Sequence, residues 1–215
     1  MTPRRTPFRT DFGTAAVVGA VFFMAAAFGG FSARAQSLNF AGGDSDQPIQ
    51  VFAEDGIEWQ QENLIFVARG KARAVRGTFE VHADVLRAFY RETADGGTDI
   101  QRLDAEGSVR IVTPGEKAFG NQGVYQIDNA IFVLSGGNPR FVTDQDVISA
   151  SRQLEYWEKK QMAVARGNAQ ATRGNKRLRA DILVAYFRRG KNGKTSVHRV
   201  DAFDGVMIDT DKDHV

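Results

Sequence analysis

Residues 66–90, FVARGKARAVRGTFEVHADVLRAFY, decide the fold, because their pattern recurs further along the chain. Residues 163–187, AVARGNAQATRGNKRLRADILVAYF, align with them without a gap, and the two copies share two Arg-Gly steps and one Ala-Asp step. Such internal similarity is typical of a repeat architecture. Weaker copies lie between and after them, and a glycine marks each copy at intervals of 29 to 38 residues: Gly70, Gly107, Gly136, Gly167 and Gly205.

Apolar and polar side chains alternate inside each copy. In the first copy Phe79, Val81 and Ala83 are separated by single polar residues. A period of two predicts strands with one face buried and the other in water. The phase shifts at Asp84, because the apolar set continues at Leu86 and at every second residue after it. We therefore expect the strand to bend or bulge at this step.

A second change of phase is expected at the repeated glycine, Gly70. There Ile65 and Val67 give way to Ala72 and Ala74 as the apolar set. Two bends in each repeat would curve a sheet. Beyond the first 35 residues, no stretch of the sequence has the pattern of a convincing amphipathic helix. The sequence therefore predicts one all-β domain, a curved antiparallel sheet built from tandem β repeats.

The amino terminus has the order of a secretory signal peptide. Three arginines precede an apolar run over residues 14–31, and the small-residue site Ala33-Arg34-Ala35 follows. This order predicts cleavage between Ala35 and Gln36. A retained membrane anchor is the alternative, since the run is about as long as the roughly 18 residues that a span needs.

Composition narrows the classes of function. The chain has no cysteine, so neither a lipoprotein anchor nor a disulfide framework is available. Without the leader, 24 Lys and Arg stand against 25 Asp and Glu, which argues against a nucleic-acid binder. The remaining residues are enough for one domain with its own core. We expect a flexible segment over 36–47, the β domain over 48–210 and a short tail over 211–215.

The sequence offers little for catalysis or metal binding. Its histidines, His82, His198 and His214, form no metal-spaced pair. The best enzyme hypothesis pairs Asp84 with Asp181 as in glycoside hydrolases. The alternative is that each aspartate binds backbone N–H groups at its own corner, which explains why the residue recurs with the motif. We expect no enzyme activity, no metal and no cofactor.

Three motifs stand out around the first copy: Asp46-Gln47-Pro48-Ile49, the glycine step at Gly70, and the corner Ala83-Asp84-Val85-Leu86. Together they resemble the start of the LptA/OstA-like family of lipopolysaccharide-transport proteins, and the resemblance covers about residues 46–210. It implies a β-jellyroll, or β-taco, of stacked antiparallel strands with an apolar groove along its axis. It also implies a periplasmic protein that holds the acyl chains of lipopolysaccharide (LPS) on their way from the inner to the outer membrane.

The resemblance implies that lipid contacts come from inward-facing apolar residues, transferred by strand and phase. In the first copy these residues are Ile49, Val51, Ile65, Val67, Val81, Ala83 and Leu86. Through the internal repeat they extend to Ile131, Val133, Met162, Val164, Leu178, Ala180 and Leu183. The inward alanines at the bends either leave volume for a ligand or mark places where strands pack tightly, and the sequence leaves both readings open.

The partners implied by the resemblance are LPS itself, an LptC-like protein of the inner membrane and an LptD-like protein of the outer membrane. Unpaired strand edges of an open roll would allow docking of like-folded proteins and head-to-tail self-association. The candidate edges are residues 49–53 and 200–208. A membrane-anchored LptC-like relay subunit and a purely structural β-solenoid are the alternative functions.

Overall fold

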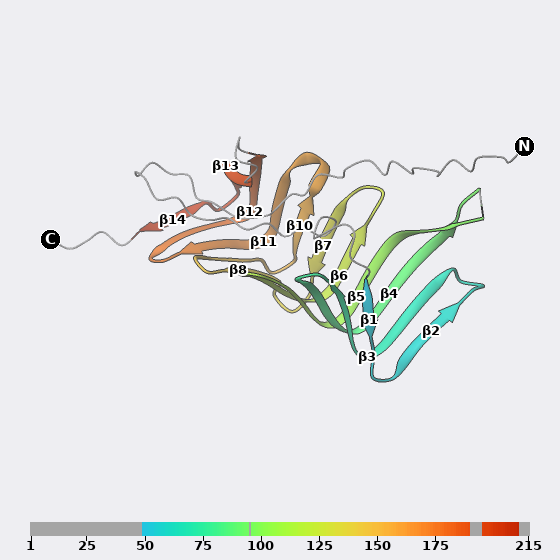
Figure 1. The fold of residues 1–215 in the computed structure, drawn as a ribbon. Helices are drawn as coiled ribbons and strands as arrows, with labels where there is room; N and C mark the ends of the chain where they lie inside the picture. Colours follow the sequence, from blue (N-terminus) through green and yellow to red (C-terminus); the bar gives the residue numbers. More distant parts are fainter. Residues whose placement is uncertain (1–48, 95, 190–194, 211–215) are drawn as a thin grey trace, which may run out of the picture.

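The computed structural model describes residues 49–94, 96–189 and 195–210 (Figure 1). The predicted cleavage site at Ala35 and Gln36, the segment 36–47 and the tail 211–215 lie outside the described residues. The strands are β1 (Gln50–Phe52), β2 (Gly56–Gln60), β3 (Ile65–Arg76), β4 (Phe79–Glu92), β5 (Thr98–Thr113), β6 (Glu116–Gln126), β7 (Ile131–Ser135), β8 (Arg140–Thr143), β9 (Asp146–Ser149), β10 (Gln153–Trp157), β11 (Met162–Arg173), β12 (Lys176–Arg189), β13 (Thr195–Phe203) and β14 (Met207–Thr210), with one short 3₁₀-helix, η1 (Glu158–Lys160).

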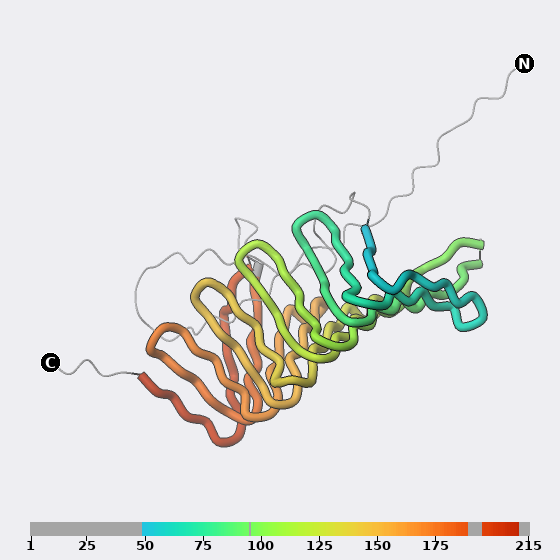
Figure 2. Tube along the Cα trace, turned by 90° about the horizontal axis from the view of Figure 1, so that it is seen from below, coloured from blue at the N-terminus to red at the C-terminus, as the bar shows by residue number. Residues whose placement is uncertain are grey.

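All these strands pair antiparallel in a single folded sheet. Each long strand crosses a corner, so that its two halves belong to two facing walls. Wall A has the order β2-β3-β4-β5-β6-β7-β10-β11-β12-β13, and wall B has the order β1-β3-β4-β5-β6-β8-β9-β11-β12-β14. Figure 2 shows the folded strands stacked along one axis. The prediction of a curved antiparallel β-jellyroll is confirmed.

The corners arise where the strand register shifts. Between β3 and β4 the shift falls between Arg69 and Ala72, and the two residues between them have positive φ angles, 77° at Gly70 and 43° at Lys71. A Cβ atom added to Gly70 would lie 2.5 Å from Cγ of Asp55 on the neighbouring segment. This close approach and the left-handed backbone explain why glycine recurs at the corner.

The two repeated aspartates lie at separate corners. Asp84 stands at the corner of β4, where its Oδ2 would be 2.0 Å from a Cβ atom on Gly107. At the corner of β12, the backbone N–H of Asn168 donates to Oδ1 of Asp181 at 3.3 Å. Six strand-to-strand steps separate β4 from β12, or about 29 Å at the usual spacing. Asp84 and Asp181 therefore do not form the carboxylate pair of a glycosidase, whose members lie within about 10 Å of each other.

The predicted phase shift at Asp84 is confirmed, whereas the one at Gly70 is wrong. In β4, Val81 before the corner and Leu86 after it face the space between the walls. In β3, Phe66 and Ala68 line this space before the corner, and Ala74 lines it after the corner together with Val75 and Arg76. Two left-handed residues turn the corner together, so the even-numbered positions of β3 stay on the inner face throughout.

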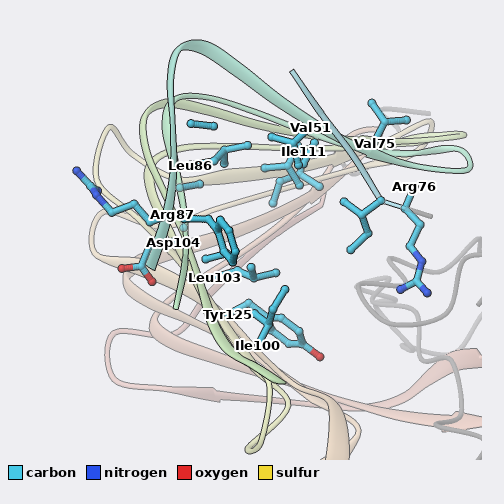
Figure 3. Close-up of a pocket in the computed structure, with 18 of the residues that line it drawn as sticks. Val51, Val75, Arg76, Leu86, Arg87, Ile100, Leu103, Asp104, Ile111 and Tyr125 are labelled. Atoms are coloured by element: carbon cyan, nitrogen blue, oxygen red, sulfur yellow. The ribbon is translucent and has the colours of Figure 1, made fainter. Parts of the chain in front are cut away.

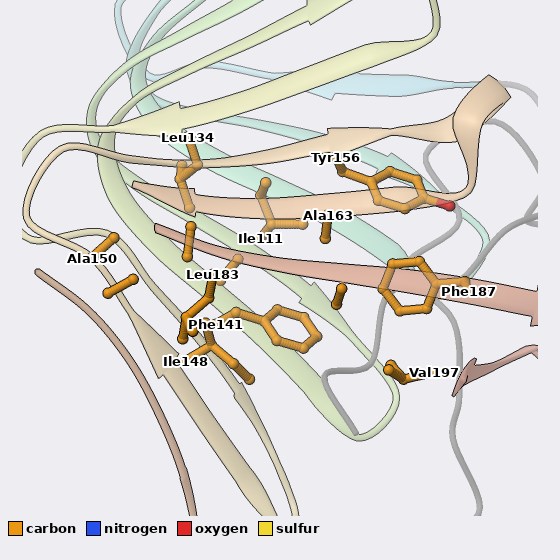
Figure 4. Close-up of a cluster of buried hydrophobic side chains, with 14 of the residues drawn as sticks. Ile111, Leu134, Phe141, Ile148, Ala150, Tyr156, Ala163, Leu183, Phe187 and Val197 are labelled. Carbon is orange, nitrogen blue, oxygen red and sulfur yellow. The ribbon is translucent and has the colours of Figure 1, made fainter. Parts of the chain in front are cut away.

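Between the walls, the C-terminal half of the roll is filled by side chains. Leu134, Tyr156 and Leu183 of wall A meet Phe141 and Ile148 of wall B in one buried cluster (Figure 4). A full cluster of this kind supplies the core that the cysteine-free chain needs. No helix among the described residues is long and apolar enough to cross a membrane.

Candidate functional site

An apolar groove of about 390 Å³ lies between the walls in the N-terminal half of the roll (Figure 3). Its lining comes from strands β1 to β7 and from the residues that flank them. Wall A contributes chiefly Ile57, Phe66, Leu86, Leu103, Tyr125 and Phe132. Wall B contributes chiefly Val51, Ala74, Phe79, Val81, Val109 and Ile111.

Small residues at the corner give the groove its depth. Ala105 and Gly123 are cross-strand partners near the bottom of wall A, and Ala68 lies in the same row on the far side of Leu86. A Cβ atom on Gly123 would be 3.6 Å from Cγ1 of Val109, which comes from wall B, so the walls meet there. Larger side chains stand above this floor. The groove is thus closed at the corner and open toward the rims of the two walls.

The few charged residues of the lining point their charges away from the apolar interior. In Figure 3 the guanidinium groups of Arg76 and Arg87 lie on opposite sides, away from the gathered apolar side chains. Arg87 Nη1 donates to Glu106 Oε2 at 2.6 Å, and Arg102 Nε donates to Asp104 Oδ1 at 2.6 Å. The groove interior is therefore suited to an apolar ligand, held by burial of its surface rather than by ionic contacts.

Aromatic side chains reinforce the rim of wall A. Trp59 on the edge strand β2 stacks on Phe66, with ring centroids 5.6 Å apart, and its Nε1 donates to the hydroxyl of Tyr90 at 2.8 Å. Further along the rim, the Tyr125 hydroxyl donates to Glu158 Oε2 at 3.4 Å. Burial raises the pKa of Tyr125 to about 12, so this phenol stays protonated and can act as a donor.

The His, Asp and Glu side chains of the described ranges 49–94, 96–189 and 195–210 do not gather into a metal-binding group. No group of three or more His, Asp or Glu side chains lies close enough there to hold a metal ion. The lining residues named above are almost entirely hydrocarbon, and such side chains bind by shape and burial.

The predicted lipid-contacting residues fall into three groups in the structure. Four of them line the groove: Ile49, Val51, Val81 and Leu86. Four face inward but belong to the buried cluster: Ala83, Leu178, Ala180 and Leu183. Six lie on the outer face of the sheet: Ile65, Val67, Ile131, Val133, Met162 and Val164. Lipid contact at individual residues stays a prediction.

The six outer-face residues correct the predicted phase of β3, β7 and β11. In each of these strands the inward positions are the neighbours of the predicted ones, such as Phe66 and Phe132. Val67 faces outward, between its cross-strand partners Glu58 and Arg87, yet it is only 2% exposed. An apolar and buried residue on the outer face favours the wrong phase for β3. Long polar side chains can cover an outward valine with their aliphatic stems.

Sequence reasoning also missed the aromatic part of the lining. Phe66, Tyr125 and Phe132 pair across neighbouring strands or face the same space, and none of them was predicted to contact the ligand. The inward position of Ala88 in β4 was predicted correctly, and Phe66 is its cross-strand partner. This pairing places Phe66 on the inner face as well. Cross-strand partners share a face of the sheet.

Comparison with known proteins supports the same family as the motifs. Residues 54–154 match the model of the family described as LptA/(LptD N-terminal domain) LPS transport protein. An uncharacterized protein of Rhizobium meliloti (strain 1021) is 28% identical over 109 residues, which are 49% of this chain and 56% of that protein. The chain thus spans little more than half the length of this curated relative.

Among solved structures, the chain is similar to LptH from Pseudomonas aeruginosa, described as the LptA homologous periplasmic component of the lipopolysaccharide transport device. The identity is 14%, the TM-score is 0.48, and the alignment covers 77% of this chain and 98% of LptH. The fold assignment rests on the strand pairing described above. Residues 54–154, which include the groove-lining strands β3 to β7, are thus similar to the LptA/(LptD N-terminal domain) family of LPS transport proteins.

Proposed function

We propose that this protein is a periplasmic LPS carrier, which holds the acyl chains of LPS in the groove and helps to bridge the inner and outer membranes. The observation that carries the proposal is the open apolar groove between the walls, built from the part of the chain that matches the LPS transport family. No covalent chemistry is needed for this task.

The size of the groove sets the expected affinity. Burying an acyl chain gains about 0.8 kcal/mol per methylene group, so about ten buried methylenes would gain about 8 kcal/mol. Association costs about 4 kcal/mol or more in lost translational and rotational freedom. A single chain would therefore bind weakly. Firm binding requires several chains at once, as in the lipid part of LPS.

Both ends of the roll support docking to like-folded partners. Ile57, which lines the groove on edge strand β2, is 56% exposed, and Ile208 on edge strand β14 is 61% exposed. Ile208 pairs with inward-facing Leu178, so the apolar inner face continues to the last strand. Strand pairing at these edges would join the inner faces of LptC-like, LptD-like or identical partners into one path for acyl chains.

The alternative of a membrane-anchored LptC-like relay subunit depends on the leader. Intact mass of the protein isolated from the periplasm separates the two readings: a chain that starts at Gln36 supports the carrier, and a retained leader supports the relay subunit. The other alternative, a purely structural solenoid, should have a filled interior along its whole length. The groove in the N-terminal half argues against it.

Binding of LPS to the purified full-length protein tests the proposal. We expect Leu103→Asn, which places an amide in the groove lining, to lower LPS affinity about 5- to 150-fold, because an unpaired polar group in an apolar site costs about 1–3 kcal/mol. Val124→Asn on the outer face of neighbouring β6 is the matched control and should bind as the wild type does. Failure of the wild-type protein to bind LPS would refute the proposal.

A further inference from the structure

A cluster of polar side chains stands on the rim of wall A, directly beside the groove. Tyr125 lines the groove from β6. Tyr156, on β10, is the cross-strand partner of the groove-lining residue Phe132 and so faces the same interior. Glu158 opens helix η1 at the end of β10, and its carboxylate accepts the hydrogen bond from Tyr125.

Tyr156 is the least satisfied member of this cluster. It is 6% exposed, and its hydroxyl oxygen is buried with no hydrogen-bond partner among the described residues. Figure 4 shows the ring of Tyr156 near that of Phe187, with the hydroxyl at the end of the side chain that points away from Leu134 and Leu183. Buried polar groups in native proteins are nearly always hydrogen-bonded, so an unpaired one requires an explanation.

The neighbours of Tyr156 are also poised to exchange partners. The hydrogen bond from Tyr125 to Glu158 is long, at 3.4 Å, and long bonds of this kind are weak. Burial raises the pKa of Glu158 and that of Tyr156, and the charge of Glu158 raises the pKa of Tyr156 further. The carboxylate and both phenols are thus close to one another, and together they offer donors and acceptors at the edge of an apolar site.

We infer that Tyr125, Tyr156 and Glu158 form a binding site for the hydroxyl-bearing sugar headgroup of an amphiphile whose acyl chains occupy the groove. The inference rests on the proposed function and adds to it the recognition of the polar part of the ligand. A sugar hydroxyl supplies both an acceptor for the Tyr156 O–H and a donor for the Glu158 carboxylate. The ligand thereby supplies a partner for the Tyr156 hydroxyl, which has none among the described residues.

The geometry of the groove implies that its apolar interior and the rim cluster bind different parts of the ligand. The groove is closed at the corner and open at the rims, so an amphiphile enters with its chains toward Gly123 and its headgroup toward the rim. Burial of the chains supplies most of the affinity. Hydrogen bonds to the cluster supply selectivity for the headgroup, because an analogue without hydroxyls leaves Tyr156 unpaired. A simple fatty acid should therefore not depend on this cluster.

Tyr156→Phe tests the inference because it removes one oxygen atom and little else. LPS affinity should fall about 3- to 10-fold, the usual effect of one lost neutral hydrogen bond, while binding of a fluorescent fatty acid should stay within about twofold of wild type. The variant should be as stable as wild type or more stable, since it loses a buried unpaired hydroxyl. Weaker binding in a more stable protein excludes misfolding as the cause.

Two further variants complete the experiment. Glu158→Gln should lower LPS affinity about 10-fold through loss of a charged acceptor. Tyr186→Phe, on the outer face of β12 beneath the Arg199 guanidinium, is the matched control and should bind LPS as wild type does. Unchanged LPS affinity in both Tyr156→Phe and Glu158→Gln overturns the headgroup site and leaves the carrier function standing. Absence of LPS binding to wild type overturns both proposals.

Discussion

Tryptophan substituted at two alanines of β4 should separate the ligand groove from the packed core. Ala88 lines the groove, next to Phe66 and Leu103 on the neighbouring strands. Ala83 lies one corner away, is 3% exposed, and packs against its cross-strand partner Ala72 in the buried part of the roll. The same enlargement should therefore have opposite consequences at the two sites.

The magnitudes follow from the two environments. At Ala88 an indole occupies space that a ligand would fill, and displacement of about three methylene groups costs about 2.4 kcal/mol of binding, or roughly 60-fold in affinity. At Ala83 there is no such space, and overpacking costs about 1–3 kcal/mol of stability. For a domain of this size, that loss lowers the melting temperature by about 2–12 °C.

Two measurements on each variant check this expectation. Thermal unfolding followed by circular dichroism should show a lowered melting temperature for Ala83→Trp and a nearly unchanged one for Ala88→Trp. Displacement of a bound fluorescent fatty acid by LPS should show the affinity loss for Ala88→Trp. The reasoning is refuted if Ala88→Trp binds LPS normally, or if Ala83→Trp blocks binding without any loss of stability.

Three further changes probe the packed half and the corners by urea unfolding. Burial raises the pKa of Glu116 from 4.5 to about 8, so the folded protein binds this proton more tightly than the unfolded chain does. The free energy of unfolding should therefore fall by up to about 5 kcal/mol as the pH rises from 4.5 to 8. Glu116→Gln should remove most of this pH dependence. Gly107→Ala, at φ 76° with Asp84 2.0 Å from the new Cβ, should cost about 1–3 kcal/mol, whereas an unchanged midpoint would mean that the corner relaxes. Asp146→Asn breaks a buried pair with Arg173 and should cost about 3 kcal/mol; a loss below about 0.5 kcal/mol would show that the pair is screened.

The corner of β4 could be predicted from sequence, whereas the corner of β3 could not. At Asp84 a single residue turns the chain, so the apolar positions change from odd to even numbers, and this change is visible in a pattern of period two. At Gly70 and Lys71 two left-handed residues turn it, so the inward positions stay even. Val67, which is apolar and buried on the outer face, then supported the wrong phase.

The internal repeat also could not predict that one half of the interior is an open groove and the other half is filled by side chains. Ala88 and Ala185 occupy equivalent positions of the two copies, yet Ala88 lines the groove and Ala185 is fully buried. The difference comes from residues that belong to the same cluster as Ala185, such as Phe141 on the short strand β8. A local sequence pattern cannot show which strands meet across a fold.

Site-specific photocrosslinking to LPS tests the central claim most directly, with a photoreactive residue placed at one position at a time in the full-length protein. Val81 and Leu86 on β4 line the groove. Val67, on the neighbouring strand β3, faces outward, and Leu183 is fully buried in the packed half. We expect strong capture of LPS from Val81 and Leu86 and little from Val67 and Leu183. Equal capture from Val67 and Val81, or no capture from either groove position, would contradict an acyl-chain groove between the walls.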